Sequence, residues 1–579
     1  MESLSYDIVI LGSGIAGFTA ALHAARSKAK PRIAVISKMH AMRSHSVSAE
    51  GGISGVLYPK IKKDTEDLHA YDTIKGSDYL ADQDAVEILV KNAPSEIKFF
   101  EHIGVPWNRD EKGTVQQRPF GGMSIPRTAF AADKTGFFMM RALYDQALAV
   151  ENIEIFHEHL ATAIVLDKGR FAALPTIDIA TGEQRIFRSR ACIIATGGFS
   201  RVFGFTTTAY SSTGDGTALA YRAGIPLKDM EFVQFHPTAL IPSGILITEA
   251  ARGEGGYLFN AKGERFMERY AKNKMELAPR DIISKAIISE IEKGRGFPDK
   301  EYGYSYVHLD LRHLDRRVID EKLPMIKEIT IKMLGIDPGD EPIPVRPAAH
   351  FTMGGIHTDI KGRILSQEGR PFGGLWAAGE CGCVSVHGAN RLGSNSLSQC
   401  SVWGRITGEA AADYASKEGR PAESEEIVRK IDEEERRISG ILESDGSNNP
   451  YEIKKMLNKT MDSRMYVYRR VPEMRKAIAE ISRLKKEFND IYLEDRGRRF
   501  NTNLRDVLEI GNMLELAAAV AESAVRRKES RGAHSMVEYP KRDDKHWLKH
   551  TLISANEGKI RISYLPVTLG GWKPEERKY

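Results

Sequence analysis

Short apolar runs that end in glycine recur along the chain and alternate with helical patterns. Residues 6–38 contain an apolar run (YDIVIL), a glycine turn, a helix of small residues (FTAALHAARS) and a second apolar run (RIAVIS). Two later runs have the same character: ACIIATGG, which ends in Gly197 and Gly198, and GLWAAGE, from Gly374 to Glu380. Such strands, spread over a chain and separated by helices, are typical of a parallel sheet. We therefore expect one α/β core that an insertion interrupts.

The pattern changes in three later segments. Residues between His236 and Val345 mix helical patterns such as DIISKAIISEIEK with turn-containing pieces. After about Gly419 charged helices follow, and the longest carries apolar residues at helical spacing: Val507, Ile510, Leu514, Ala517, Ala521 and Val525. Beyond Gly532 we expect a short-stranded, irregular tail. These changes predict a core of residues 1–235 and 345–415, an inserted α+β domain of residues 236–344, a helical domain of residues 416–530 and a small C-terminal domain of residues 531–579.

Composition and charge exclude several classes of protein. No apolar run is long enough to cross a bilayer, and the start, MESLSYDIVIL, lacks the basic region of a secretory signal. The 4 cysteines are too few for a disulfide framework, CGC has no histidine cluster nearby, and we expect no metal site. The net charge of +5 comes from mixed acids and bases. The densest basic patch, RRKESRGAH near Arg526, fits a solvated helix end, so we expect no nucleic-acid partner.

A glycine-rich turn joins the first strand to the first helix. It reads G-x-G-x-x-G and comprises Gly12, Ser13, Gly14, Ala16 and Gly17. Glycines allow the backbone to approach a pyrophosphate, and the helix start offers unpaired N–H groups to it. The acid expected about 20 residues further on is absent, and Ser37 and Lys38 stand there instead. This departure argues against an ordinary NAD site and leaves FAD open.

Four later stretches set polar groups beside glycine or proline. They are EFVQFHPT with His236, ILITEAARGEGG with Thr248, Glu249 and Arg252, RPAAHFTMGGI with His350, and HGANRLGSNSL with Arg391. Each could be structural by itself, because a lone histidine is more often hydrogen-bonded in the core or solvated than catalytic. Together these histidines, arginines and the threonine form a donor-rich set that suits an anionic ligand.

Three further positions carry two interpretations each. Arg280 stands just before a predicted helix, where the dipole mildly disfavours a cation; alternatively, Asp281 caps the helix and Arg280 points to water. Another helix begins near Ser396 and Leu397, where its N–H groups could face the N1–C2=O edge of a reduced flavin, or Ser396 could be an ordinary cap. In RSHSVSAEGGI, His45 taken alone would be a solvated loop histidine.

The motifs together resemble one family, from the first strand to the tail and in family order. RSHSVSAEGGI, GGMSIPRTAFAADKTG, STGDG, MEFVQFHPT, ITEAARGEGG, APRD, HFTMGGI, GECGCVSVHGANRLGSNSL and ESRGAH are similar to the flavoprotein subunits of succinate dehydrogenases and fumarate reductases. The resemblance implies an α/β Rossmann-like FAD-binding domain with an inserted α+β capping domain, then a helical domain and a small C-terminal domain. It also implies succinate–fumarate interconversion by hydride transfer with covalently bound FAD. The implied partners are an iron–sulfur subunit and membrane-anchor subunits with quinone, at the cytoplasmic face of the inner membrane.

The resemblance assigns roles to individual residues. His45 is the implied covalent attachment point of FAD. The other positions that hold FAD in the family are Gly12, Ser13, Gly14, Ala16, Gly17, Ser37, Lys38, Ser44, Ser46, Gly51, Gly52, Asp215, Glu380, Ser396 and Leu397. The dicarboxylate is implied to bind His236, Thr248, His350 and Arg391. Arg280 matches the proton-transferring arginine, with Glu249 and Arg252 as its relay.

Other members of the wider fold remain as alternatives. L-aspartate oxidase lacks the histidine motif, and adenylylsulfate reductase lacks the dicarboxylate set, whereas a thiol-dependent fumarate reductase subunit would look similar. A non-catalytic flavoprotein would be expected to have lost Arg280, Glu249 or His45. Glu50 resembles fumarate reductases, because succinate dehydrogenases more often carry glutamine there. A carboxylate near the flavin would lower its potential, which leans toward fumarate reduction.

Overall fold

The structure is a computed structural model that describes residues 2–298, 303–556 and 559–578. Its central sheet contains the predicted apolar runs as parallel neighbours, in the order β20 (Pro371–Ala377), β12 (Ala191–Ile194), β2 (Ile8–Leu11) and β3 (Ile33–Ile36). A further parallel strand, β7 (Ile153–Phe156), pairs with β3. The strands β2, β3 and β12 are buried along their whole length, as expected for a parallel sheet covered on both faces. The predicted α/β class is confirmed.

One strand differs in its limits from the prediction. We expected the run from Gly374 to Glu380, but β20 ends at Ala377. Gly379 has φ +74°, a left-handed conformation that a strand does not continue through, and the short helix Gly379–Cys381 follows. Toward its other end the sheet continues through β10 (Arg170–Asp178) and β11 (Gln184–Arg188) to β1 (Glu2–Ser5).

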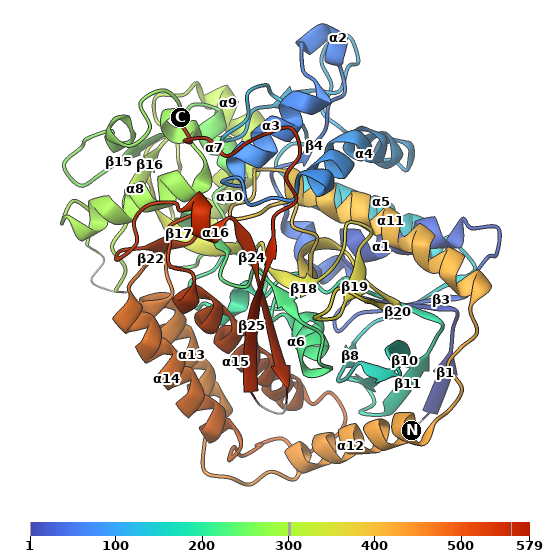
Figure 1. Ribbon diagram of the computed structural model, residues 1–579. Helices are drawn as coiled ribbons and strands as arrows, with labels where there is room; N and C mark the ends of the chain where they lie inside the picture. The colour runs from blue at the N-terminus through green and yellow to red at the C-terminus, as the bar shows by residue number, and fades with distance from the viewer. Residues whose placement is uncertain (1, 299–302, 557–558, 579) are drawn as a thin grey trace.

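Helices cover the central sheet and lead the chain back to it. The first helix, α1 (Ile15–Ala25), packs against the long α11 (Asn395–Lys417), and Gly404 and Gly408 of α11 lie where a Cβ would touch the α1 backbone. Three more helices lie on this side of the molecule (Figure 1): α3 (Glu66–Gly76), α4 (Gln83–His102) and α5 (Thr135–Leu148).

The insertion has a sheet and a core of its own. Its four strands run in the order β14 (Val233–Leu240), β17 (Ile343–Thr352), β16 (Val307–Asp310) and β15 (Tyr257–Phe259). The helices around it are α7 (Glu249–Gly253), α8 (Arg280–Glu292), α9 (Arg316–Lys322) and α10 (Pro324–Leu334). Because β14 and β17 are antiparallel neighbours, the chain leaves and re-enters the α/β part side by side.

A helical segment follows, at the lower left of Figure 1. It contains α13 (Pro450–Arg464), α14 (Val471–Phe488) and α15 (Thr502–Arg526), and α12 (Glu425–Leu442) precedes it. The face predicted for α15 is buried from Val507 to Ala521, and Val525 is half-buried at its end. No helix among the described residues is apolar enough over a sufficient length to cross a membrane.

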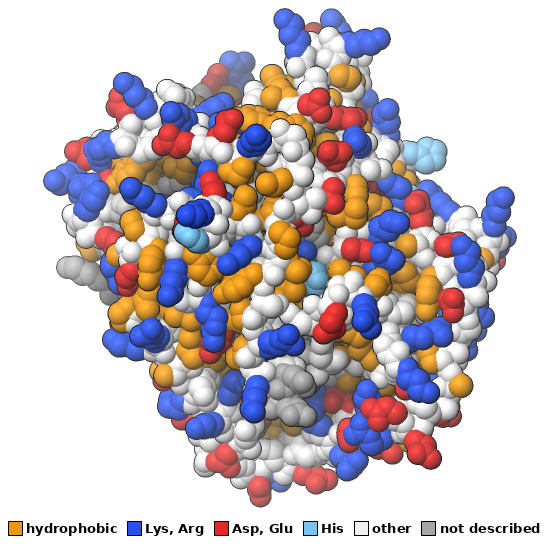
Figure 2. Space-filling view, viewed as in Figure 1, with side chains coloured by type: hydrophobic (Ala, Val, Ile, Leu, Met, Phe, Trp, Pro, Cys, Tyr) orange, Lys and Arg blue, Asp and Glu red, His pale blue; other side chains and the backbone are white. Residues whose placement is uncertain are grey.

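The tail and the basic patch differ from expectation. The strands β24 (Lys549–Asn556) and β25 (Lys559–Pro566) pair over eight residues each, and β24 also pairs with β13 (Leu227–Lys228). The expectation of an irregular tail was wrong, because β24 and β25 form a regular antiparallel pair that extends the sheet beside β13. Arg527 and Arg531 of the basic patch are fully buried and pair with Glu529. A solvated helix end therefore does not explain them. On the face in Figure 2, basic and acidic side chains are interspersed.

Candidate active site

A cavity of about 660 Å³ lies where the carboxyl ends of the central strands meet the insertion. Leu11, Ile36 and Ala195 line it from the ends of β2, β3 and β12, the usual position of a ligand in a parallel sheet. The cavity wall contains every site residue that the sequence predicted except Gly17 and Arg252. These two lie directly behind the wall.

The glycine turn has the shape that a dinucleotide requires. Gly12 has φ +118°, and a Cβ there would stand 2.2 Å from the carbonyl oxygen of Ala195. A Cβ on Gly17 would stand 1.9 Å from the oxygen of Gly12, so Gly17 keeps the turn closed rather than touching a ligand. Gly14 precedes α1, whose first residues line the cavity. This glycine cradle, open to the cavity at a helix start, fits the pyrophosphate of FAD.

Beside the turn, Lys38 is held between two carboxylates. Its Nζ lies 2.6 Å from Asp215 and 2.6 Å from Glu509, which belongs to α15. Burial raises the pKa of Glu509. Burial also opposes the ionisation of Asp215, but pairing with Lys38 lowers its pKa below the usual value. Asp215 is therefore the ionised partner of Lys38, and Ser13 and Ser37 close the adjoining wall with a 2.7 Å hydrogen bond.

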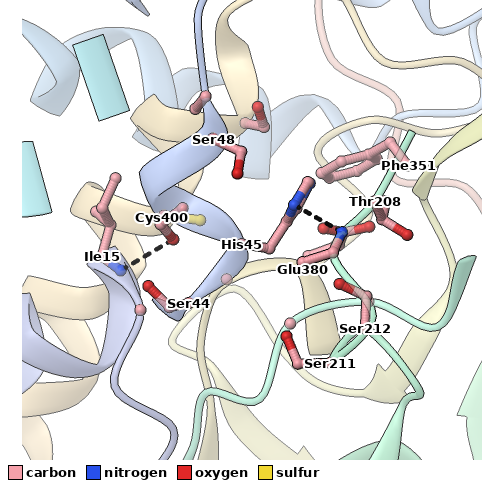
Figure 3. Close-up of a pocket in the computed structure, with 18 of the residues that line it drawn as sticks. Ile15, Ser44, His45, Ser48, Thr208, Ser211, Ser212, Phe351, Glu380 and Cys400 are labelled. Carbon is pink, nitrogen blue, oxygen red and sulfur yellow. Dashed lines mark hydrogen bonds between the residues drawn. The ribbon is translucent and has the colours of Figure 1, made fainter. Parts of the chain in front are cut away.

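His45 lies in the cavity wall rather than in a solvated loop (Figure 3). Its Nδ1 accepts a hydrogen bond of 3.2 Å from the backbone N–H of Ala209. Burial, together with the charges of Arg201 and Arg391, lowers the pKa of His45 to about 4. At neutral pH the imidazole is therefore uncharged, with Nδ1 as the acceptor and the single proton on Nε2. On the same loop the Oγ of Ser46 accepts from the N–H of Ile15, which ties the loop to the start of α1.

The residues expected to bind a dicarboxylate converge from separate elements. His236 on β14 and His350 on β17 have ring centroids 5.0 Å apart. Thr248 precedes α7, and Arg391 lies before α11 with Nη1 3.2 Å from Ser396. Nε2 of His236 and Nε of Arg391 are buried without a hydrogen-bond partner among the described residues. Buried polar atoms without partners are costly, and a ligand in the cavity would give these two a partner.

Arg280 begins α8 and is only 7% exposed, so the interpretation that it points to water is wrong. Its Nε donates to Glu249 over 2.7 Å, and its Nη1 donates to Gln234 over 3.2 Å. Asp281 does not cap the helix, because its carboxylate pairs with Arg577 and Lys285.

Behind Arg280 a short chain of charged groups continues away from the cavity. Glu249 also accepts from the N–H of Gly121 over 2.6 Å, and Arg252 lies 3.8 Å from its other oxygen. Burial opposes the ionisation of Glu249, but Arg280 and Arg252 lower its pKa below the usual value. The arrangement is an arginine at the cavity with a buried carboxylate behind it.

Sequence reasoning missed several residues that shape the site. Gln234 orients Arg280, and the hydroxyl of Thr207 lies 2.6 Å from Nδ1 of His350. Gln234 stands two residues before His236, a spacing that puts side chains on one face of a regular strand and could have revealed it. Thr207 belongs to a run of threonines, and Glu509 to a helix 471 residues from Lys38, so neither carried a signal.

Glu50 corrects one electrostatic argument. We treated it as a carboxylate beside the flavin, but burial raises its pKa well above the usual value, and Asp133 adds to the rise. A raised pKa favours the neutral acid, which exerts no such field. The physical argument from Glu50 for fumarate reduction therefore loses its basis.

The glycine cradle, the cavity at the strand ends and the inserted domain over it define an FAD-dependent flavoprotein. A family model for an FAD binding domain matches residues 7–397, and a model for the C-terminal part of fumarate reductase flavoproteins matches residues 454–579. The chain belongs to the family of fumarate reductase and succinate dehydrogenase flavoprotein subunits, which are oxidoreductases.

Individual relatives agree over the full length. The chain is 45% identical to the fumarate reductase flavoprotein subunit of Mycobacterium tuberculosis, with 99% of each chain covered. It is 42% identical to the succinate dehydrogenase flavoprotein subunit of Rickettsia bellii, covering 97% of this chain and 95% of that one. A solved chain of Escherichia coli quinol fumarate reductase matches with a TM-score of 0.96 and 40% identity, over 100% of this chain and 99% of that one.

Proposed function

We propose that this chain is the catalytic flavoprotein subunit of a complex that interconverts fumarate and succinate. The observation that carries the proposal is the position of Arg280, which lies at the cavity wall with the hydrogen-bonded Glu249 directly behind it. Unpartnered donors of His236 and Arg391 lie in the same site. A proton source beside a set of anion-binding donors suits the reduction of an unsaturated dicarboxylate.

FAD is the cofactor, and the residues present fit it. The turn Gly12–Gly17 and the start of α1 would hold the pyrophosphate, and Ser37, Lys38 and Asp215 would line its nucleoside side. The start of α11, at Ser396 and Leu397, would face the pyrimidine edge of the ring, where a helix N-terminus stabilises negative charge. When bound, FAD accepts or supplies hydride at its N5.

The dicarboxylate would be bound by residues of both parts of the chain. Arg391 and the two histidines would bind the carboxylates, and Thr248 would add a hydroxyl donor from the insertion. Fixed donors hold the alkene in one orientation, which converts a bimolecular encounter into a positioned reaction. Donors on one carboxylate also draw electron density from the distant alkene carbon, which makes that carbon electrophilic.

Arg280 would deliver a proton to the alkene carbon that does not receive the hydride. An arginine has a pKa above about 12 and gives up a proton reluctantly, so it must regain one at once. Glu249 accepts its Nε–H at 2.7 Å, and Arg252 lies 3.8 Å beyond. We propose that these two groups return the proton to Arg280, and that succinate oxidation follows the same route in reverse.

His45 would carry FAD covalently. Its low pKa of about 4 keeps the imidazole neutral and nucleophilic at physiological pH. The N–H of Ala209 occupies the lone pair of Nδ1, so a bond through Nε2 would form as the proton on Nε2 is lost. A covalent bond prevents loss of the flavin. It also distinguishes this chain from L-aspartate oxidase, in which the flavin is not covalently bound.

The complex around this chain follows from its relatives. Matching structures are named as quinol fumarate reductase with menaquinol and as a succinate dehydrogenase complex with ubiquinone. We infer that an iron–sulfur subunit exchanges electrons with the flavin and that anchor subunits bring this chain to the membrane. We expect a peripheral position at the cytoplasmic face of the inner membrane. The identities of 45% to a fumarate reductase subunit and 42% to a succinate dehydrogenase subunit favour succinate–fumarate interconversion over a thiol-dependent enzyme or L-aspartate oxidase.

The test combines a covalent-flavin assay with activity. The purified chain is denatured in acid, separated on a gel and examined for flavin fluorescence in the protein band. We expect a fluorescent band that disappears in His45→Ala, together with fumarate reduction by the wild-type chain. Flavin released entirely into the supernatant, with aspartate oxidised faster than succinate, would overturn the proposal.

A further inference from the structure

A segment after β25, residues 567–578, runs across the α/β part toward the insertion (Figure 1). We call this segment the arm. The N–H of Thr568 donates to Asp82 over 2.7 Å, and the N–H of Gly570 donates to Gln83 over 2.8 Å. The Nζ of Lys75 donates to the carbonyl oxygen of Lys578 over 3.1 Å. The arm is therefore fixed to α3, α4 and the turn between them.

Arg577 of the arm connects the two parts of the chain. Its Nη2 lies 2.6 Å from Asp281 of α8 in the insertion and 3.1 Å from Asp78, which follows α3. The side chain of Arg577 is 10% exposed, that of Asp281 is 0% exposed, and that of Asp78 is 7% exposed. One buried guanidinium thus joins the start of α8 to the FAD-binding part.

The two carboxylates depend on Arg577 to different degrees. Asp78 also pairs with Arg542 at 2.8 Å and accepts from the N–H of Gly532. Asp281 has Lys285 as its other cationic neighbour, at 3.7 Å. Removing Arg577 therefore leaves Asp78 well paired, whereas Asp281 becomes a poorly compensated buried charge. The loss of Arg577 should therefore destabilise mainly the start of α8.

Asp281 is the residue next to Arg280, so the same helix start carries both groups. Arg280 reaches Glu249 within the insertion and Gln234 on β14, at 2.7 and 3.2 Å. These distances hold only while the start of α8 keeps its place over the cavity. A shift of about 1 Å in a reacting group can cost about 100-fold in rate.

We propose that Arg577 is a positioning residue for proton transfer: through Asp281 it fixes the start of α8, and so the place of Arg280, against the FAD-binding part. The inference rests on the proposed role of Arg280 as proton donor and deepens it. Arg577 itself touches neither the cavity nor the residues expected to bind substrate.

The experiment compares three variants of the full-length, FAD-loaded chain. Arg577→Gln removes the charge, and Arg577→Lys keeps it without the planar fork that can engage two carboxylates. Lys578→Gln is the matched control, because Lys578 is exposed and pairs only weakly with the exposed Glu576. Fumarate reduction by a reduced one-electron dye gives kcat and KM, normalised to bound FAD, and hydrogen–deuterium exchange reports on residues 280–284.

We expect kcat of Arg577→Gln to fall about 10- to 100-fold, with KM for fumarate changed less than about threefold. The reason is that loss of the Arg577–Asp281 pair displaces Arg280 but not the residues that bind the carboxylates of the substrate. The solvent deuterium isotope effect should rise, because proton transfer becomes slower. Exchange at 280–284 should increase, Arg577→Lys should recover part of the rate, and Lys578→Gln should match wild type.

Two results would overturn the inference. One is an unchanged kcat in Arg577→Gln. The other is a parallel loss of kcat, fumarate affinity and exchange protection throughout the chain, which would mean a merely structural role. Exchange at 280–284 does not depend on the reaction. If the wild-type chain fails to reduce fumarate, the proposed function fails, whereas a selective effect of Arg577→Gln on exchange still establishes the link to α8.

Discussion

The hydrogen bond between Thr207 and His350 tests how the substrate cavity is organised. Thr207 Oγ1 lies 2.6 Å from Nδ1 of His350. Burial lowers the pKa of His350 well below its usual value, and Arg280 and Arg391 add to this, so the free imidazole is neutral. A neutral imidazole has a single N–H. We infer that the Thr207 hydroxyl donates to Nδ1, because this places the N–H on Nε2, where it can donate to a substrate carboxylate. Thr207→Val keeps the shape of the side chain and removes the hydroxyl that decides which nitrogen of His350 carries the proton.

The size of the effect follows from the partial burial of the pair. A net hydrogen bond contributes about 1 kcal/mol, and an unsatisfied buried partner costs about 1–3 kcal/mol. Because about 1.4 kcal/mol corresponds to a factor of 10, we expect KM for fumarate to rise about 5- to 100-fold. The turnover number should fall less, because Arg280 and Glu249 keep their hydrogen bond. Steady-state fumarate reduction by the FAD-loaded chain measures both quantities.

Thr207→Ser is the matched control, because it keeps the hydroxyl and loses one methyl group. We expect its KM to stay close to that of wild type. A KM in Thr207→Val within about twofold of wild type would refute the reasoning, since a lost buried hydrogen bond should cost more than that. An equal loss in Thr207→Ser would refute it too, because packing and not the hydroxyl would then matter.

Three further substitutions test other parts of the site and the tail. Arg280→Lys removes the planar guanidinium group that donates to both Glu249 and Gln234, so kcat for fumarate reduction should fall about 100- to 10,000-fold. Retention of a tenth of the wild-type kcat would contradict this. Asp215→Asn removes the ionised partner of Lys38 and should destabilise the chain by about 3 kcal/mol, whereas Glu509→Gln should have little effect on the thermal midpoint. The reverse order would show that Glu509 carries the charge. His550 lies 2.6 Å from Asp229 and 3.1 Å from Asp82, and although burial opposes it, these carboxylates raise its pKa to about 9. Its stabilisation is complete below pH 6.5 and is lost as the pH rises to about 9, a change of about 3 kcal/mol. The thermal midpoint of His550→Asn should therefore lie furthest below wild type at pH 6.5 and approach it at pH 9; a gap that stays constant would show that His550 does not titrate in this way.

Local patterns in the sequence determined the α/β class, the glycine turn and the order of the motifs. Short apolar runs became β2, β3 and β12, because residues buried on both sides of a parallel sheet must be apolar throughout. The G-x-G-x-x-G turn was readable because only glycine fits positions such as Gly12 and Gly17. Each of these features leaves its mark on a short stretch of the sequence.

Only the tertiary structure decided which side chains meet. The pairing of Lys38 with Glu509 joins residues 471 positions apart, and the contact of Arg577 with Asp281 joins residues 296 positions apart. The pair of strands β24 and β25 joins its sheet through β13, which lies some 300 residues earlier in the chain. Burial also changed the chemistry of residues that the sequence had already singled out, since desolvation makes Glu50 hard to ionise and keeps His45 neutral. A sequence lists which groups are available, whereas the surrounding fold fixes their partners, their solvation and therefore their charge.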